Sequence, residues 1–325
     1  MVAESVLVHL VEPETADDSA QVASAMQREI GRVVRGKDEA VQFAVVALLA
    51  GTHLLIEDTP GTGKTLLAKS LASAVGGRFR RVQCTPDLLP SDLTGTTVYS
   101  PATSEWQFRP GPVFANVLLA DELNRSSPRT QSALLEPLEE HQVSADGARY
   151  ALPNPFCCIA TQNPFGSAGT FPLPESQLDR FGLVIRMGLP SRVAERSILT
   201  GESGTDVLSS IRAVTDPDGV LRAIAAARAI HVADPIYDYV LDIVAATRTQ
   251  PSVALGASPR AAKGLLRTAQ AHALVSGRTY CSIDDVQAVA ASALAHRLAL
   301  LSGPDIDAGA QIIGSILATV AVPRP

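Results

Sequence analysis

Aromatic and basic residues are scarce in this chain. Aromatic side chains make up 4% of the 325 residues, and 27 lysines and arginines stand against 33 aspartates and glutamates, so the net charge is 27 − 33 = −6. A surface that binds DNA or RNA needs clustered positive charge and exposed aromatic rings. Direct nucleic-acid binding is therefore disfavoured, and the acidic balance favours a water-soluble protein.

Paired cysteines and metal-ligand spacings are also lacking. The six histidines are scattered, and no C-x-x-C pair occurs among the four cysteines, which are Cys84, Cys157, Cys158 and Cys281. We expect reduced thiols in a cytoplasmic protein and structural roles for the histidines.

No segment reads as a signal peptide or a membrane span. Acidic residues punctuate Met1 to Asp18 where a signal peptide would be basic. The most apolar segment, Ala308 to Val322, is interrupted by Gln311, Ser315 and Thr319. It is shorter than the roughly 20 residues that a membrane helix needs. We expect it to be a buried closing segment.

The most informative stretch runs from Leu54 to Thr65. An apolar run predicts a strand, glycines predict a tight loop, and a helical pattern follows Lys64-Thr65. This combination favours a loop that binds the phosphates of ATP, and a chance glycine turn is the less favoured alternative. Lys64 would neutralise the β- and γ-phosphates and the Thr65 hydroxyl would ligate Mg²⁺. We expect nucleotide contacts from Asp58, Thr59, Pro60, Gly61, Thr62, Gly63, Lys64 and Thr65.

Asp58 departs from the phosphate-binding pattern G-x-x-x-x-G-K-[ST], because it occupies the first glycine position. That position is at the mouth of the loop, so we expect the Asp58 carboxylate to face solvent. The turn at Val33 and Val34, ahead of this unit, is where the adenine of a P-loop ATPase often packs.

Polar residues follow two further buried strands. The strand Val117 to Ala120 ends at Asp121 and Glu122. Carboxylates at the carboxyl end of a parallel strand favour a ligand site over a solvated acidic turn. Asp121 would hold the Mg²⁺ shell and Glu122 would act as general base on a water. After the strand Phe156 to Ala160, the amide in Thr161-Gln162-Asn163-Pro164 could position that water.

The order of these patterns predicts an α/β fold with a parallel sheet, followed by a small helical domain. We expect a disordered segment over 1–18, a nucleotide-binding core over 19–190, a connecting helix and linker over 191–218, and a helical lid over 219–325. Asp146-Gly147 predicts a hairpin from Val143 to Leu152, and Pro137 should end or kink a helix. The loop from Trp106 to Phe114 fits either core packing or a role facing a partner or a pore.

Several longer motifs resemble the MoxR family of AAA+ ATPases. The resemblance covers roughly Ala23 to the C-terminus and is carried by Gln83–Gly95, Asp121–Arg125, Gln131–Glu136, Thr161–Pro164, Gln177–Phe181 and Leu255–Ala261. The departures are Asp58, Cys84 in place of the usual Phe, and Pro137.

The resemblance implies that Asn163 is sensor 1, Arg180 the arginine finger and Arg260 sensor 2. It also implies an AAA+ core and lid, a homo-oligomeric ring that is hexameric, and chaperone-like remodelling or maturation of client proteins, often with a von Willebrand factor A domain partner. Arg180 should act on the ATP of the neighbouring subunit. Arg260, in the first turn of a helix, should aim at phosphates near the crevice between the domains.

The leading hypothesis is therefore an enzyme that couples Mg-ATP hydrolysis to protein remodelling. The main alternative is a nucleotide-gated scaffold that binds ATP with little turnover. Transcriptional activation and metal chelatase activity are disfavoured, because no basic DNA-binding helix is present near the C-terminus.

Overall fold

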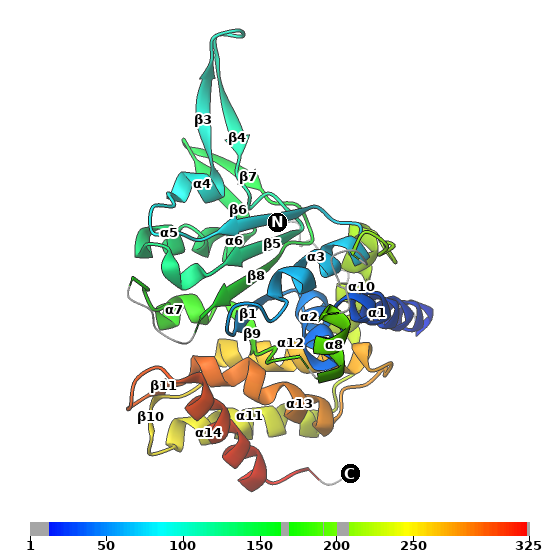
Figure 1. The fold of residues 1–325 in the computed structure, drawn as a ribbon. Coiled ribbons are helices and arrows are strands. Elements are labelled where there is room, and N and C mark those ends of the chain that lie inside the picture. Colours follow the sequence, from blue (N-terminus) through cyan, green and yellow to red (C-terminus); the bar gives the residue numbers. More distant parts are fainter. Residues whose placement is uncertain (1–12, 164–168, 191, 200–207, 324–325) are drawn as a thin grey trace, which may run out of the picture.

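The structure is a computed structural model that describes residues 13–163, 169–190, 192–199 and 208–323. An α/β core with a projecting hairpin lies at one end and a helical domain lies at the other (Figure 1). The core strands are β1 (His53–Glu57), β2 (Phe79–Gln83), β5 (Val117–Asp121), β8 (Cys157–Gln162) and β9 (Phe181–Ile185).

These five strands form one parallel sheet in the order β2-β5-β8-β1-β9. All residues of β1, β5 and β9 are buried, as expected when helices cover both faces of a parallel sheet. The carboxyl ends of β1, β5 and β8 consequently meet at one edge. The sequence-based expectation of an α/β fold with a parallel sheet is confirmed.

Helices and hairpins complete the core. The helices are α1 (Pro13–Val33), α2 (Asp38–Leu49), α3 (Lys64–Ala74), α4 (Pro90–Thr94), α5 (Pro128–Ser132), α6 (Leu135–Glu140), α7 (Glu175–Leu178) and α8 (Arg192–Leu199), with a 3₁₀ turn, η1 (Leu123–Arg125). Two antiparallel hairpins pair β3 (Gly95–Ser100) with β4 (Glu105–Pro110), and β6 (Gln142–Ala145) with β7 (Ala148–Ala151).

The helical domain contains α10 (Pro217–Ala229), α11 (Asp234–Thr249), α12 (Pro259–Val275), α13 (Ile283–Leu294) and α14 (Ile306–Thr319). It also contains a 3₁₀ turn, η2 (Ala295–Arg297), and a short antiparallel pair, β10 (Val253–Leu255) with β11 (Ala299–Leu300). The domain predicted to be all-helical therefore includes one small two-stranded sheet. No helix of the described residues is long and apolar enough to cross a membrane.

Several boundaries differ from those predicted. Helix α1 begins at Pro13, inside the segment expected to be disordered, and residues 1–12 lie outside the described residues. Residues 191 and 200–207 of the expected linker also lie outside them, and α10 begins at Pro217. The loop expected over 106–114 begins with most of β4, the second strand of the β3–β4 hairpin, which projects from the core (Figure 1).

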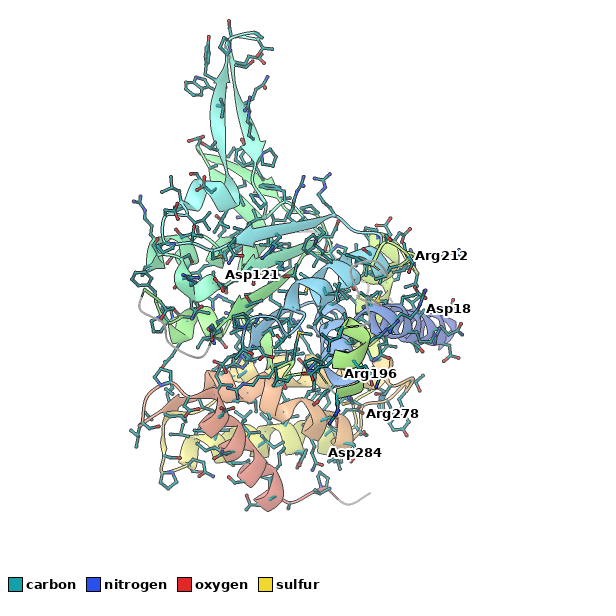
Figure 2. The ribbon with its side chains drawn as sticks, viewed as in Figure 1. Asp18, Asp121, Arg196, Arg212, Arg278 and Asp284 are labelled. Atoms are coloured by element: carbon teal, nitrogen blue, oxygen red, sulfur yellow. The ribbon has the colours of Figure 1, made fainter. Side chains whose placement is uncertain are left out.

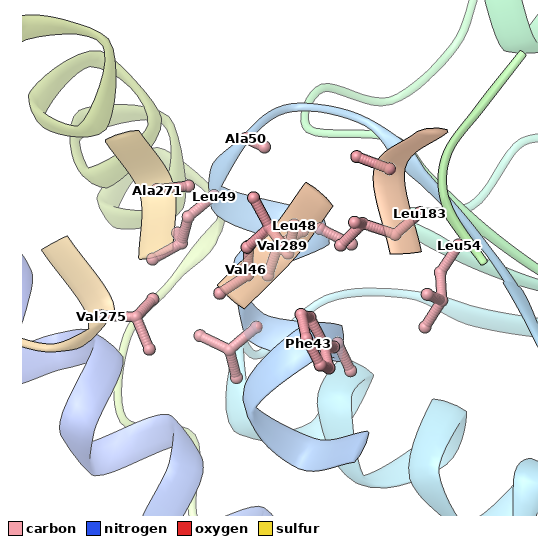
Figure 3. Packing of buried hydrophobic residues seen from close by; sticks show 14 of the residues in the cluster. Phe43, Val46, Leu48, Leu49, Ala50, Leu54, Leu183, Ala271, Val275 and Val289 are labelled. Carbon is pink, nitrogen blue, oxygen red and sulfur yellow. The ribbon is translucent and has the colours of Figure 1, made fainter. Parts of the chain in front are cut away.

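Helix α2 joins the sheet to the helical domain. Phe43 and Leu49 of α2 lie in one continuous apolar cluster with Leu54 and Leu183 of the sheet and Val275 of α12 (Figure 3). The helical domain is therefore docked by apolar packing on the side of the sheet that carries β1 and β9.

Candidate nucleotide-binding site

The loop between β1 and α3 has the backbone of a phosphate-binding loop. Gly61 has φ 85° and Gly63 has φ 97°, which is left-handed backbone that glycine adopts most easily. Gly63 is the N-cap of α3, so the helix N-terminus opens toward the loop. Backbone N–H groups and the helix dipole at such a position attract an anion.

Lys64 is already held against this loop. Its Nζ donates to the carbonyl oxygens of Asp58 at 2.8 Å and Thr59 at 2.7 Å. Burial lowers the pKa of Lys64, while the nearby carboxylates of Asp58, Asp121 and Glu122 act to raise it. The ammonium group is therefore held by the loop and feels the charge of the two carboxylates predicted to serve catalysis.

Asp58 does not face solvent, and that expectation is wrong. The Asp58 side chain is buried, and its carboxylate accepts hydrogen bonds from three backbone N–H groups. The donors are Thr59 at 2.7 Å, Met187 at 3.0 Å and Gly188 at 2.7 Å. An aspartate at the first glycine position thus ties the loop to the segment that leaves β9.

Lys37 extends this connection to the turn predicted to contact adenine. Its Nζ donates to the carbonyl oxygens of Met187 at 2.8 Å and Gly188 at 2.7 Å. Burial lowers the pKa of Lys37, and Asp58 opposes the shift. Val33 and Val34, just before it, are buried in the core. Their contact with adenine stays a prediction.

Asp121 lies at the carboxyl end of β5 (Figure 2) and has two partners. Its Oδ1 accepts from the Thr161 hydroxyl at 2.7 Å, and its Oδ2 accepts from Arg81 Nη2 at 2.7 Å. Sequence reasoning missed Arg81 and gave Thr161 no role. Gln83 pairs with Asp121 across β2 and β5, and Arg81, two residues earlier, lies on the same face of the sheet, but no sequence signal indicated that these two strands are neighbours.

The oxygen ligands at this edge fit Mg²⁺. The Asp121 carboxylate and the Thr65 hydroxyl are hard donors of the kind that Mg²⁺ prefers, together with phosphate oxygens and water. No group of three or more His, Cys, Asp or Glu side chains that could hold a metal is found in the described part of the chain. Such a donor set suits an ion that arrives with a nucleotide.

Glu122 has a strained backbone and a restrained carboxylate. Its φ is 56° and its ψ is 49°, an uncommon conformation for a residue with a side chain. The Glu122 N–H donates to the Thr161 hydroxyl at 2.8 Å. The Glu122 Oε2 accepts from Gln83 at 3.1 Å and Arg125 at 3.0 Å. These two donors hold the predicted general base, and sequence reasoning assigned neither of them.

Asn163 follows β8 at the same edge. Its carbonyl oxygen accepts from Asn124 Nδ2 at 3.2 Å, which fixes the backbone where β8 ends. Pro164, the last residue of that predicted motif, lies outside the described residues.

Arg180 and Arg260 are not at this edge. Arg180 precedes β9, whose first residue, Phe181, lies beside His53 at the start of β1. Because β1 has five residues of about 3.3 Å each, Arg180 is roughly 16 Å from the loop along the strand. Arg260, which we expected to aim at the crevice of its own chain, instead joins Arg180 there.

Glu139 of α6 brings these two arginines together. Its Oε2 lies 2.7 Å from Arg180 Nη2 and its Oε1 lies 3.0 Å from Arg260 Nη1. Asp179 lies 3.6 Å from Arg260 Nε and 3.8 Å from Arg180 Nη1.

Both arginines line a cavity of about 350 Å³ at the amino end of the sheet. Burial and the neighbouring Arg228 lower the pKa of Arg267, as expected where like charges crowd together. Two carboxylates, Glu139 and Asp179, face six cationic residues in the lining: Arg180, Arg228, Arg260, Lys263, Arg267 and Arg297. This excess of positive charge favours an anion.

Two family models match the chain. Residues 53–183 match the ATPase family associated with various cellular activities (AAA), and residues 245–314 match an AAA lid domain. These segments cover the sheet with its loop and most of the helical domain.

Three relatives match most of the chain. Chaperone MoxR1 of Mycobacterium tuberculosis is 39% identical, over 97% of this chain and 87% of that protein. Protein MoxR of Methylorubrum extorquens is 31% identical, over 87% and 89%. Protein YeaC of Bacillus subtilis is 42% identical, over 90% and 92%.

Solved structures agree with these matches. A crystal structure from Cytophaga hutchinsonii, whose protein carries a provisional ATPase assignment, aligns with a TM-score of 0.86 and 34% identity over 96% of this chain and 98% of that one. With these relatives matched over most of their length, the chain belongs to the MoxR family of AAA+ ATPases.

Proposed function

We propose that this chain hydrolyses Mg-ATP and couples the reaction to remodelling or maturation of partner proteins. The observation that carries the proposal is the division of the charged groups. The phosphate loop, Asp121 and Glu122 gather at one end of the sheet, and Arg180 and Arg260 gather at the other. The site is therefore complete only when a neighbouring chain supplies the arginines.

Each residue at the carboxyl end has a separate task. The loop amides and Lys64 bind the β- and γ-phosphates, while Thr65 and Asp121 would hold Mg²⁺. The ion, when bound, supplies positive charge that offsets charge on the transferred phosphoryl group. Glu122 accepts a proton from the attacking water after Gln83 and Arg125 release its carboxylate. Asn163 orients that water.

The arginines act in trans. A guanidinium offers two parallel donors to phosphate oxygens, so Arg180 and Arg260 can both engage the nucleotide of the next subunit once Glu139 gives them up. The arrangement requires a head-to-tail interface, which can close into a ring, and the family resemblance favours a hexamer. We also propose that its target is a client protein that works with a von Willebrand factor A domain partner. The proposed location is the cytoplasm.

A nucleotide-gated scaffold with little turnover is the second candidate. It is favoured by the two donors, Gln83 and Arg125, that already occupy the Glu122 carboxylate. Steady-state phosphate release separates the two functions. The enzyme hypothesis expects turnover that rises with protein concentration and falls by about 10²–10⁴ in Glu122→Gln, which should still bind ATP. A wild-type chain that binds ATP in rings without turnover would favour the scaffold.

Mixing of variants tests the trans arrangement. Arg180→Ala and Lys64→Ala should each be inactive alone, since an arginine finger contributes about 10³–10⁵ in rate. Mixed rings should recover turnover where an intact loop meets an intact arginine. Mixed rings that assemble and stay inactive would refute the trans arrangement.

The Glu122→Gln chain, which should bind ATP without hydrolysing it, can also be used to co-purify a client protein.

A further inference from the structure

We propose that Arg297 of the helical domain is a positioning residue that sets where the chain presents Arg180 and Arg260 to its neighbour. The proposal rests on the trans action of those two arginines. It adds that the helical domain moves the arginines with it, so that one subunit's domain motion controls hydrolysis in the next.

The first support is the set of contacts that Arg297 makes with the segment that carries Arg180. The Arg297 side chain is only 6% exposed, and its Nε lies 3.1 Å from Asp179 Oδ1. Its Nη2 donates to the carbonyl oxygens of Phe181 at 3.1 Å and Asp179 at 3.4 Å. The two residues that flank Arg180 are thus both held by one guanidinium.

The second support is His296, the preceding residue. Its Nε2 lies 2.9 Å from the same Phe181 carbonyl oxygen, and the ring is buried. Burial and the adjacent Arg297 lower the pKa of His296 to about 3, so the ring is neutral and its Nε2–H donates. Two consecutive residues of η2 therefore hold the start of β9.

The third support is the contact of Arg297 with α12, the helix that begins with Arg260. Gly264 lies one turn after Arg260, and a Cβ added at Gly264 would lie 2.8 Å from Arg297 Nη1. The guanidinium therefore fills the space that a side chain at position 264 would need. Arg297 contacts both elements that carry the trans-acting arginines.

Burial decides which of these contacts persists. Arg180 and Arg260 are 20% and 48% exposed in their pairs with Glu139, which is itself 37% exposed, whereas Arg297 is 6% exposed in its pair with Asp179. Exposed ion pairs exchange readily with solvent, but a buried guanidinium that loses its partner is left uncompensated. The Glu139 contacts can yield to a phosphate while the Arg297 contacts remain. A movement of the helical domain therefore carries residues 179–181 along.

Two variants test this without deleting the charge. Arg297→Lys keeps the positive charge and loses the planar fork that holds Asp179 and Phe181 together. Gly264→Ala favours the helix yet displaces Arg297 Nη1. Gly314→Ala in α14 is the matched control, because a Cβ there meets no atom within 4 Å. We expect kcat to fall about 10²-fold in both test variants, as for a misplacement of about 1 Å, with KM and ring assembly unchanged.

Complementation then identifies the site that Arg297 serves. If it positions the arginines offered to the neighbour, Arg297→Lys should recover activity when mixed with Lys64→Ala and none when mixed with Arg180→Ala. Recovery with Arg180→Ala would overturn the proposal, because Arg297 would then serve its own chain's nucleotide. Wild-type kcat in both test variants would also overturn it.

The reference mixture of Arg180→Ala with Lys64→Ala separates this failure from failure of the proposed function. If that mixture recovers activity and the Arg297→Lys mixtures behave otherwise than stated, only the role of Arg297 is refuted. If the reference mixture stays inactive, the trans arrangement is refuted and the role of Arg297 with it.

Discussion

Replacing Thr161 by valine should lower stability and turnover together. The Thr161 side chain is fully buried, and its hydroxyl accepts from the Glu122 N–H at 2.8 Å and donates to Asp121 Oδ1 at 2.7 Å. Valine has nearly the same shape, so no cavity forms. The variant removes only the hydrogen bonds that join the Thr161 hydroxyl of β8 to the Asp121 carboxylate and to the Glu122 backbone N–H.

The magnitude follows from the two groups that lose a partner. A hydrogen bond to a charged acceptor such as Asp121 contributes about 1.5–3 kcal/mol, and an unsatisfied buried N–H such as that of Glu122 costs about 1–3 kcal/mol. Asp121 Oδ2 keeps Arg81, which moderates the loss. We expect a total of about 3 kcal/mol. At about 2 °C per kcal/mol for a chain of this size, the Tm should fall by roughly 6 °C.

Turnover should fall because Glu122 depends on the same hydroxyl for its unusual backbone conformation. Its left-handed φ of 56° costs about 1–3 kcal/mol and persists only where neighbours enforce it. Release of the N–H would let Glu122 relax, and displacement of a catalytic group by about 1 Å can cost 10²-fold in rate.

Thermal unfolding and phosphate release measure both effects, and Thr268→Val is the control. The buried Thr268 hydroxyl donates to the Gly264 carbonyl oxygen of its own helix, so its loss should cost under about 1 kcal/mol. If Thr161→Val is no less stable than this control, or turns over ATP at the wild-type rate, the reasoning is refuted.

Three further predictions concern other parts of the chain. Asp58→Ala leaves three backbone N–H groups without their acceptor, so denaturant unfolding should show a loss of about 2–4 kcal/mol and titration should show weaker ATP binding. Burial lowers the pKa of His53 to about 4 and of His296 to about 3, from an unfolded value near 6.5. Below pH 6.5 the unfolded chain then binds more protons than the folded chain. The free energy of unfolding should therefore fall as the pH drops toward 4, by up to about 1.4 kcal/mol per pH unit for each histidine. Equal free energies of unfolding at pH 7 and pH 5 would contradict this. On the β3–β4 hairpin, Trp106→Ala should change stability by under about 0.5 kcal/mol because the ring is 71% exposed. Phe108→Ala should cost about 3 kcal/mol because the Phe108 ring stacks on the Tyr150 ring with 4.0 Å between the ring centroids. Equal effects of the two variants on stability would contradict these different roles of Trp106 and Phe108.

The parts of the site that follow from local sequence were predictable. Strands, tight glycines and helix caps are set by neighbours along the chain: Ser127, Ser258 and Ser282 each cap a helix by accepting from the backbone N–H three residues on. The hairpin at Asp146-Gly147 is confirmed as well. The sequence also indicated that Asp121 lies at the same edge of the sheet as the phosphate loop, because the carboxyl ends of parallel strands lie at a common edge.

Contacts between distant segments were not predictable in this way. The donors that bury the Asp58 carboxylate are 129 and 130 residues away, so nothing near Asp58 indicates them. Gln83 restrains Glu122 only because β2 lies beside β5, whereas Arg125 is a local partner three residues along the chain. The place of Arg260 in the first turn of a helix is clear from the sequence, but the position of that helix relative to the sheet, and so the surroundings of Arg260, are not.

The helical domain contacts both ends of the sheet, and the two contacts differ in strength. At the carboxyl end, Arg186 bridges Glu57 of β1 at 2.7 Å and Asp307 of α14 at 2.5 Å, with Arg186 45% and Asp307 60% exposed. At the amino end, Arg297 is almost fully buried against Asp179. An exposed pair contributes about 0–1 kcal/mol, so the Arg186 contact can open at little cost while the Arg297 contact holds. Because Arg186 leaves the sheet just before the segment that holds Asp58, a change at the phosphate loop would reach the helical domain through the weaker contact. In the proposed assembly, the stronger contact would then transmit the movement to Arg180 and so to the next subunit.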